Sequence, residues 1–177
     1  MKITLVCIGK TDFSYISAGM QIYQERLKHY VKFSAVYIPA LKNASALSEM
    51  QIKEKEGELI LKEICGGKSS SGSKGGAGAP KVSSSVWVVL LDEHGTSFDS
   101  VSWARHLEQR LSSGGTEKEL FFVIGGAYGF SEDVYAAANE KISLSKMTFS
   151  HQMVRLIFIE QLYRAFTIMK GEPYHHR

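Results

Sequence analysis

Short apolar runs rich in β-branched residues alternate along the chain with segments of helical periodicity, and this alternation constrains the fold most. The apolar runs occupy residues 3–8, 33–38, 86–91, 120–124 and 142–144. Segments that favour a helix lie at residues 16–30, 46–64, 101–111, 131–139 and 153–170. Such alternation predicts an α/β fold, in which a parallel-rich sheet is covered by helices on both faces.

One stretch breaks the alternation. Residues 66–85 read GGKSSSGSKGGAGAPKVSSS, and 13 of these 20 residues are Gly or Ser. A segment of this composition cannot bury apolar surface, which predicts a flexible insertion within a single domain spanning residues 1–177. The letters GGKS do not form a Walker phosphate loop, because Lys62 stands where that motif needs its first glycine.

Net charge and hydropathy limit the kinds of partner and the location that the chain can have. The net charge of +3 permits a polyanionic partner without demanding one. No stretch approaches the roughly 20 apolar residues of a membrane span, and the first residues read as a strand rather than a signal peptide. We therefore expect a cytoplasmic protein, although a trimmed organelle presequence stays open. Cys7 and Cys65 lack metal-ligand spacing and are expected to be reduced thiols.

The glycine loop FVIGGAYGF, residues 122–130, follows an apolar strand. In an open α/β sheet, ligands lie beyond the carboxyl ends of the strands. Gly125 and Gly126 would let a ligand or another chain segment approach the backbone closely. The spacing is not that of a dinucleotide fingerprint. A structural turn and a binding site are both open interpretations.

A second polar stretch, LSKMTFSHQMVR at residues 144–155, joins an apolar strand to an apolar helix. It can present backbone groups to an adenine edge, or it can be an ordinary loop in which Ser150 caps the helix. The helix that follows is apolar nearly all round, which suggests a subunit interface. Arg155 interrupts its apolar pattern and would be costly to bury unless paired, for example with Glu160. Glu160 and Arg164 have the spacing of an i,i+4 ion pair.

The chain resembles a known family over nearly its whole length. The resemblance rests on YQERLKHY, KEKEGELIL, VVLLDEHG, FVIGGAYGF and the long block ISLSKMTFSHQMVRLIFIEQLYRAFTIMKGEPYHH. These stretches are similar to the large-subunit ribosomal RNA pseudouridine N3-methyltransferases of the SPOUT superfamily. The resemblance implies an α/β knot fold with a C-terminal trefoil knot, S-adenosylmethionine as cofactor, and a homodimer with the last helix in its interface.

The resemblance also implies the site. The implied cofactor-binding residues are Leu91, Gly125, Leu144, Ser145, Lys146, Met147, Thr148 and Phe149. The implied catalytic residues are Arg155, Tyr174 and His175, the last two in a tail that approaches the partner's cofactor. His175 would accept the N3 proton or position the base, and Arg155 would steady negative charge on the base carbonyls. No metal is needed.

The implied substrate is large-subunit ribosomal RNA in the assembled ribosome. Basic residues on one side would then contact phosphate, and the candidates are Lys10, Lys74, Lys81, Arg155 and Arg177. Two alternatives remain: a catalytically inactive RNA- or ribosome-binding module on the same fold, and an α/β nucleotide-binding protein without an RNA partner. The failure of both nucleotide motifs weighs against the second.

Overall fold

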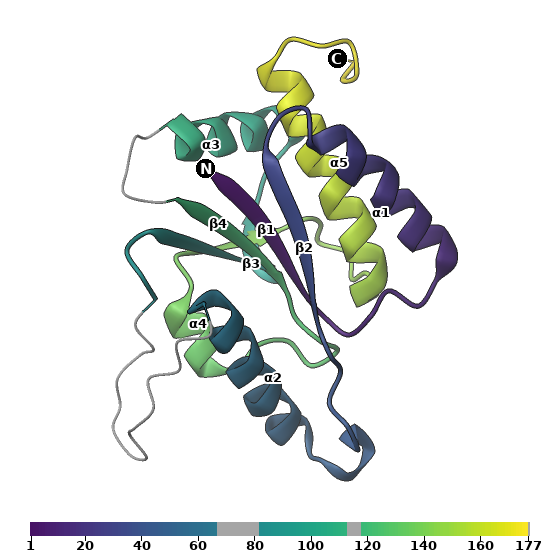
Figure 1. Ribbon diagram of the computed structural model, residues 1–177, viewed down its shortest axis with the longest axis vertical. Helices are drawn as coiled ribbons and strands as arrows, with labels where there is room; N and C mark the ends of the chain where they lie inside the picture. Colours follow the sequence, from purple (N-terminus) through teal and green to yellow (C-terminus); the bar gives the residue numbers. More distant parts are fainter. Residues whose placement is uncertain (67–81, 113–117, 177) are drawn as a thin grey trace.

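A computed structural model describes residues 1–66, 82–112 and 118–176 of the chain (Figure 1). The strands are β1 Lys2–Ile8, β2 Lys32–Ile38, β3 Val86–Ser97, β4 Glu119–Ile124 and β5 Glu140–Ser143. The helices are α1 Ser14–Leu27, α2 Glu49–Ile64, α3 Ser100–Ser112, α4 Glu132–Ala137 and α5 His151–Met169, with a short 3₁₀ turn at Ala44–Ala46. The strands form one sheet in the order β2-β1-β4-β3-β5, and every ladder between them is parallel. The predicted α/β class is confirmed.

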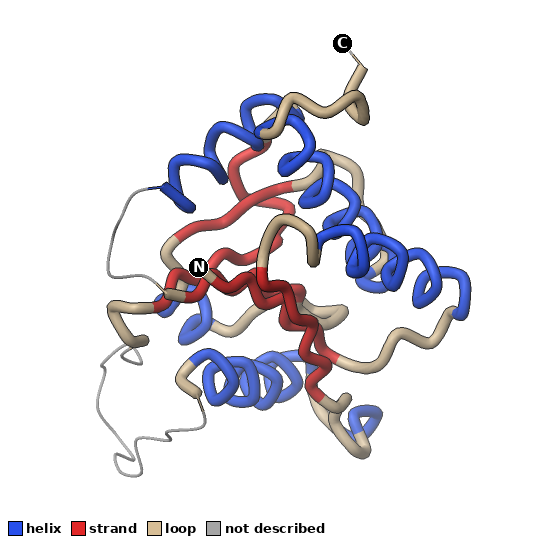
Figure 2. The backbone as a smooth tube through the Cα atoms, turned by 45° about the horizontal axis from the view of Figure 1, so that its top comes forward, coloured by secondary structure: helices blue, strands red, loops and turns tan. Residues whose placement is uncertain are grey.

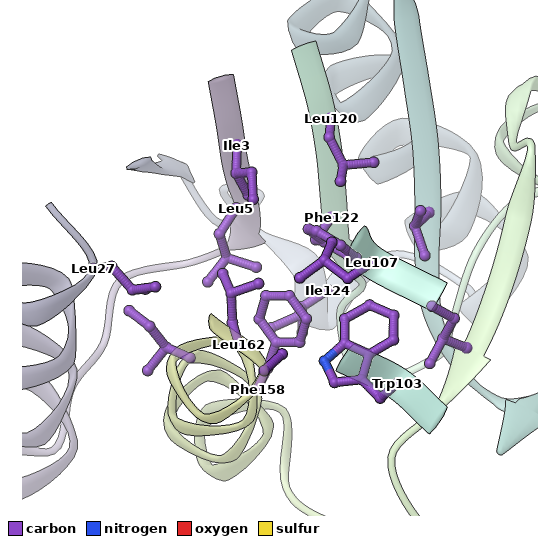
Figure 3. Packing of buried hydrophobic residues seen from close by; sticks show 14 of the residues in the cluster. Ile3, Leu5, Leu27, Trp103, Leu107, Leu120, Phe122, Ile124, Phe158 and Leu162 are labelled. Atoms are coloured by element: carbon purple, nitrogen blue, oxygen red, sulfur yellow. The ribbon is translucent and has the colours of Figure 1, made fainter. Parts of the chain in front are cut away.

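Helices cover both faces of this sheet. Helix α5 packs between α1 and α3 on one face, whereas α2 and α4 pack together on the other (Figures 1 and 2). Each face buries its own apolar cluster. On the α5 face, Phe158 and Leu162 meet Phe122 of β4 and Trp103 of α3 (Figure 3). The all-round apolar character of α5 is therefore largely explained within one chain, and the subunit interface stays a prediction.

Local sequence signals fix the helix starts. Helix α2 begins with a capping box, in which the Gln51 amide donates to Ser48 Oγ (3.2 Å) and the Ser48 amide donates to Gln51 Oε1 (3.0 Å). Ser150 caps α5 by accepting from the Met153 amide at 3.3 Å, as predicted. Ser131 precedes α4 but makes no side-chain cap.

Strand β3 continues past the predicted end at Leu91, so that boundary was wrong. After a bulge between Leu91 and Thr96, it pairs again with β5 through residues 96 and 97. The close pairing depends on Gly95, because a Cβ atom there would lie 2.6 Å from the carbonyl carbon of Ile142. The trefoil knot and the single-domain organisation stay predictions, and most of the Gly/Ser-rich segment, residues 67–81, lies outside the described residues.

Candidate functional site

A cavity of about 610 Å³ opens at the carboxyl ends of β4 and β5, beside residues 91–94 of β3. Its walls come from this part of β3, the glycine loop after β4, the loop between β5 and α5, the first turn of α5, Lys53 of α2 and Tyr135 of α4. Parallel strands deliver their following loops to one edge of the sheet, and small ligands bind at that edge. The volume lies in the usual range for a small-molecule site.

The cavity collects most of the residues expected to bind the cofactor. Those that line it are Leu91, Gly125, Leu144, Ser145, Met147, Thr148 and Phe149. Lys146 belongs to the same loop but does not line the cavity. Leu91 ends the apolar part of β3, and the loop residues follow β5 directly.

The glycine loop is tight enough to require its glycines. A Cβ atom at Gly125 would lie 3.1 Å from the Phe130 ring, and one at Gly126 would lie 2.9 Å from Glu56 Cδ. Gly129 has φ +81° and donates its amide to the Gly126 carbonyl at 3.3 Å. The loop is thus a structural turn that also lines the cavity, and its role as a binding site stays a prediction.

The β5–α5 loop is ordered by its own serines. The Ser143 hydroxyl donates to the Ser145 carbonyl, and the Met147 amide donates to Ser145 Oγ, each at 2.9 Å. These bonds hold the backbone in a bend beside the cavity. Met147 nevertheless stays 74% exposed, which places an apolar side chain in solvent at the entrance.

Two acidic residues in the bulge of β3, Asp92 and Glu93, form another wall of the cavity. Asp92 Oδ2 accepts from the Tyr135 hydroxyl (2.6 Å), and its Oδ1 accepts from the His94 amide (2.8 Å). Burial, and then the hydrogen bond to Asp92, raise the pKa of Tyr135. No sequence motif marks Asp92, Tyr135 or Lys53 as residues of the cavity.

Arg155 lies away from the cavity. Its side chain is fully buried, donating from Nη1 to Thr11 Oγ1 (2.9 Å) and from Nη2 to the Ile8 carbonyl (2.5 Å). The suggested salt bridge to Glu160 was wrong, because Glu160 pairs with Arg164 at 2.5 Å, as the i,i+4 spacing predicted. A fully buried Arg155 is also unable to contact RNA phosphate. Of the other candidates, Lys10 is exposed, and residues 74, 81 and 177 lie outside the described part.

The tail packs at the far end of α5. The Tyr174 hydroxyl donates to Glu160 Oε1 (3.0 Å) and hydrogen-bonds with the Tyr23 hydroxyl (3.2 Å), and its ring stands edge-on to Tyr163. Helix α5 has 19 residues, so it is about 28 Å long, and only its first turn, at His151 and Val154, lines the cavity. Neither Tyr174 nor His175 lines the cavity of its own chain. Figure 1 shows the C-terminal tail beyond the last turn of α5.

The residues fit an adenosyl-type cofactor. Glycine backbone at Gly125 and Gly126 forms a cradle without side chains, Leu91 and Leu144 supply apolar walls, and Asp92 offers a carboxylate. In the described parts of the chain, no three His, Cys, Asp or Glu side chains are placed to hold a metal ion. None of the described helices is long and apolar enough to cross a membrane.

Comparisons with known proteins identify the family of this chain. A family model described as "Predicted SPOUT methyltransferase" matches residues 1–175. A ribosomal RNA large subunit methyltransferase H from Christiangramia forsetii is 55% identical over 177 residues, covering 100% of both chains. A protein of the same name from Parabacteroides distasonis is 52% identical over 176 residues, covering 99% of both. Among solved structures, the SpoU methyltransferase AviRb from Streptomyces viridochromogenes, in complex with AdoMet, has a TM-score of 0.39 at 11% identity, with 97% of this chain and 61% of that chain covered.

Proposed function

The chain belongs to the SPOUT methyltransferase family, and from this premise we propose that it methylates N3 of a pseudouridine in large-subunit ribosomal RNA. Members of this family use S-adenosylmethionine, and the protein is a methyltransferase. The single observation that carries the proposal is the cavity, which unites the glycine loop with the β5–α5 loop. We propose further that it acts in the cytoplasm on the assembled ribosome.

In this proposal, residues of the chain bind the cofactor and orient its methyl group toward the target nitrogen. Leu91, Gly125 and the loop of residues 144–149 would hold the cofactor, whose sulfonium supplies an activated methyl group. The target nitrogen must lose its proton as the new N–C bond forms, so a proton acceptor has to lie beside it. Alignment of the nitrogen with the methyl group then provides much of the rate increase.

We propose that the proton acceptor comes from a second copy of the chain. Tyr174 and His175 do not line the cavity of their own chain, and the Tyr174 hydroxyl is held by Glu160 halfway along α5, so a second copy would bring them to the cavity across a dimer. His175 is the candidate acceptor, and Tyr174 would position it. Arg155 instead acts at a distance from the substrate, by tying α5 to the segment after β1 through Ile8 and Thr11.

Transfer of a radiolabelled methyl group to ribosomes that lack the modification tests this function. The parent protein should label the large-subunit RNA at one pseudouridine, and His175→Ala should label it much more slowly. Binding to ribosomes without any transfer would instead indicate an inactive binding module.

A mixing experiment tests the dimer. His175→Ala protein and a cofactor-site variant, Gly125→Val, should each be inactive alone. Subunit exchange forms about half mixed dimers with one intact site each, so about a quarter of the parent activity should return. No recovery after verified exchange would contradict a tail that acts across the interface.

A further inference from the structure

Helix α2 carries a buried carboxyl group that the proposed mechanism does not use. Glu56 is only 8% exposed, and its Oε2 atom has no hydrogen-bond donor among the described residues. Burial raises the pKa of this carboxyl group above its ordinary value. The neighbouring acids on the helix, Glu54 and Glu58, are exposed to solvent, so Glu56 is exceptional in its own element.

The Glu56 carboxyl group lies directly behind the glycine loop. A Cβ atom at Gly126 would come within 2.9 Å of Glu56 Cδ, so the group rests against the bare backbone of that residue. The next residue, Gly57, packs as closely on Ser131, since its Cβ atom would lie 3.0 Å from Ser131 Cβ. Helix α2 therefore contacts both ends of the loop, and the carboxyl group packs against Gly126, which lines the cavity.

Stability does not explain an acid in this place. A buried carboxyl group without a hydrogen-bond donor costs free energy, and a neutral side chain of similar size would relieve much of that cost. Residues that weaken the fold in this way are retained where binding needs them. Because Glu56 packs against Gly126, a residue of the cavity wall, the relevant binding event is that of a ligand in the cavity.

We propose that Glu56 is a buried counter-charge that makes the cavity prefer the cationic methyl donor to its uncharged-sulfur product. This inference rests on the proposed function. S-adenosylmethionine carries a sulfonium charge that S-adenosylhomocysteine lacks, and a carboxylate behind one layer of backbone attracts that charge through a medium of low dielectric constant. Discrimination by charge favours binding of the donor and release of the product after each transfer.

Other charged groups face the same cavity, and they do not replace Glu56. Asp92 and Glu93 at the end of β3 add negative charge, whereas Lys53 on α2 adds positive charge. Both oxygens of Asp92 already accept hydrogen bonds, from Tyr135 and His94. The Glu56 Oε2 atom accepts no hydrogen bond from the described residues, so the Glu56 carboxyl group is less compensated than that of Asp92.

Calorimetric titration with S-adenosylmethionine and with S-adenosylhomocysteine tests the inference. The proteins are the parent, Glu56→Gln, and the matched exposed control Glu58→Gln, each at about pH 8, because burial raises the pKa of Glu56 and the inference needs its carboxylate form. Glu56→Gln should weaken binding of the donor about tenfold and of the product less than about twofold. Glu58→Gln should change neither affinity. The ligand-free melting temperature of Glu56→Gln should equal or exceed that of the parent.

Each other outcome is decisive. Equal weakening of both ligands would mean that Glu56 only shapes the loop, and unchanged affinities would remove it from the site. If Glu56→Gln fails to fold, Glu56→Asp keeps the charge and must keep the preference for the donor, and its loss would overturn the inference. A parent protein that binds neither ligand would contradict the proposed function itself, which separates the two failures.

Discussion

Arg155 holds α5 to the strand β1 end, and its removal should destabilise the fold strongly. The guanidinium is fully buried and donates to Thr11 Oγ1 and to the Ile8 carbonyl. Arg155→Ala would remove both hydrogen bonds and leave a void in place of the buried side chain. Hydrogen bonds from a charged group contribute about 1.5–3 kcal/mol each, so we expect a loss of about 3–5 kcal/mol in the free energy of unfolding. For a chain of this size, that corresponds to a fall of about 10 °C in melting temperature.

Urea denaturation followed by circular dichroism measures this loss, and Arg164→Ala on the same helix is the control. Arg164 is partly exposed and forms the i,i+4 pair with Glu160, so its loss should cost less than about 1 kcal/mol. If Arg155→Ala were as stable as Arg164→Ala but inactive, the role of Arg155 in holding α5 to the end of β1 would be refuted. Arg155 would then have to reach the reacting base directly.

Three further tests address local packing and protonation. Iodoacetamide at about pH 8 should alkylate Cys65 in the native protein but not Cys7, because burial raises the pKa of the Cys7 thiol to about 12. Mass spectrometry measures the labelling of each cysteine, and labelling of Cys7 would contradict this expectation. Gly57→Ala should lower stability by about 1–3 kcal/mol in thermal melts, and adding Ser131→Gly should restore it, since the new methyl group collides with Ser131. Burial, and then the charge of Arg155, lower the pKa of His151, so the native state disfavours its proton. Stability should therefore fall as the pH drops below about 6.5 through the folded-state pKa, and His151→Gln should reduce that fall in urea titrations at several pH values.

The apolar runs predicted the sheet, because a parallel strand that is buried on both faces has a continuous run of apolar residues. It missed the second half of β3. Residues 92–97 read DEHGTS, a polar segment that lacks a strand pattern. Only Thr96 and Ser97 of this segment pair with β5, where Gly95 lets the Ile142 backbone come close, a contact between distant segments that no local spacing encodes.

The convergence of the loops that line the cavity was predictable for a related reason, whereas their assignment to a cofactor came from the family resemblance. In a parallel sheet the segments after Leu91, Ile124 and Ser143 must meet at one edge, whatever their separation in sequence. Glu56 was not predictable, because its position against Gly126 depends on how α2 packs across the sheet. The orientation of Arg155 also escaped prediction, since its acceptors belong to residues almost 150 positions earlier.

Exposed aromatic side chains lie near the start of α5, and the C-terminal tail follows its end. At its start, Phe13 and Tyr15 stack at 5.5 Å while remaining 50% and 60% exposed, and the Asp12 and Phe13 amides donate to Gln152 beside the cavity. Exposed apolar side chains gathered at one place mark an interaction surface. At the other end, the chain carries a tail that its own cavity does not receive. A two-fold contact that sets the start of one α5 near the tail of the other would bury the aromatic pair and complete each cavity. Alanine at Phe13 and Tyr15 should therefore weaken dimerisation in analytical ultracentrifugation and methyl transfer together, and loss of one without the other would contradict this arrangement.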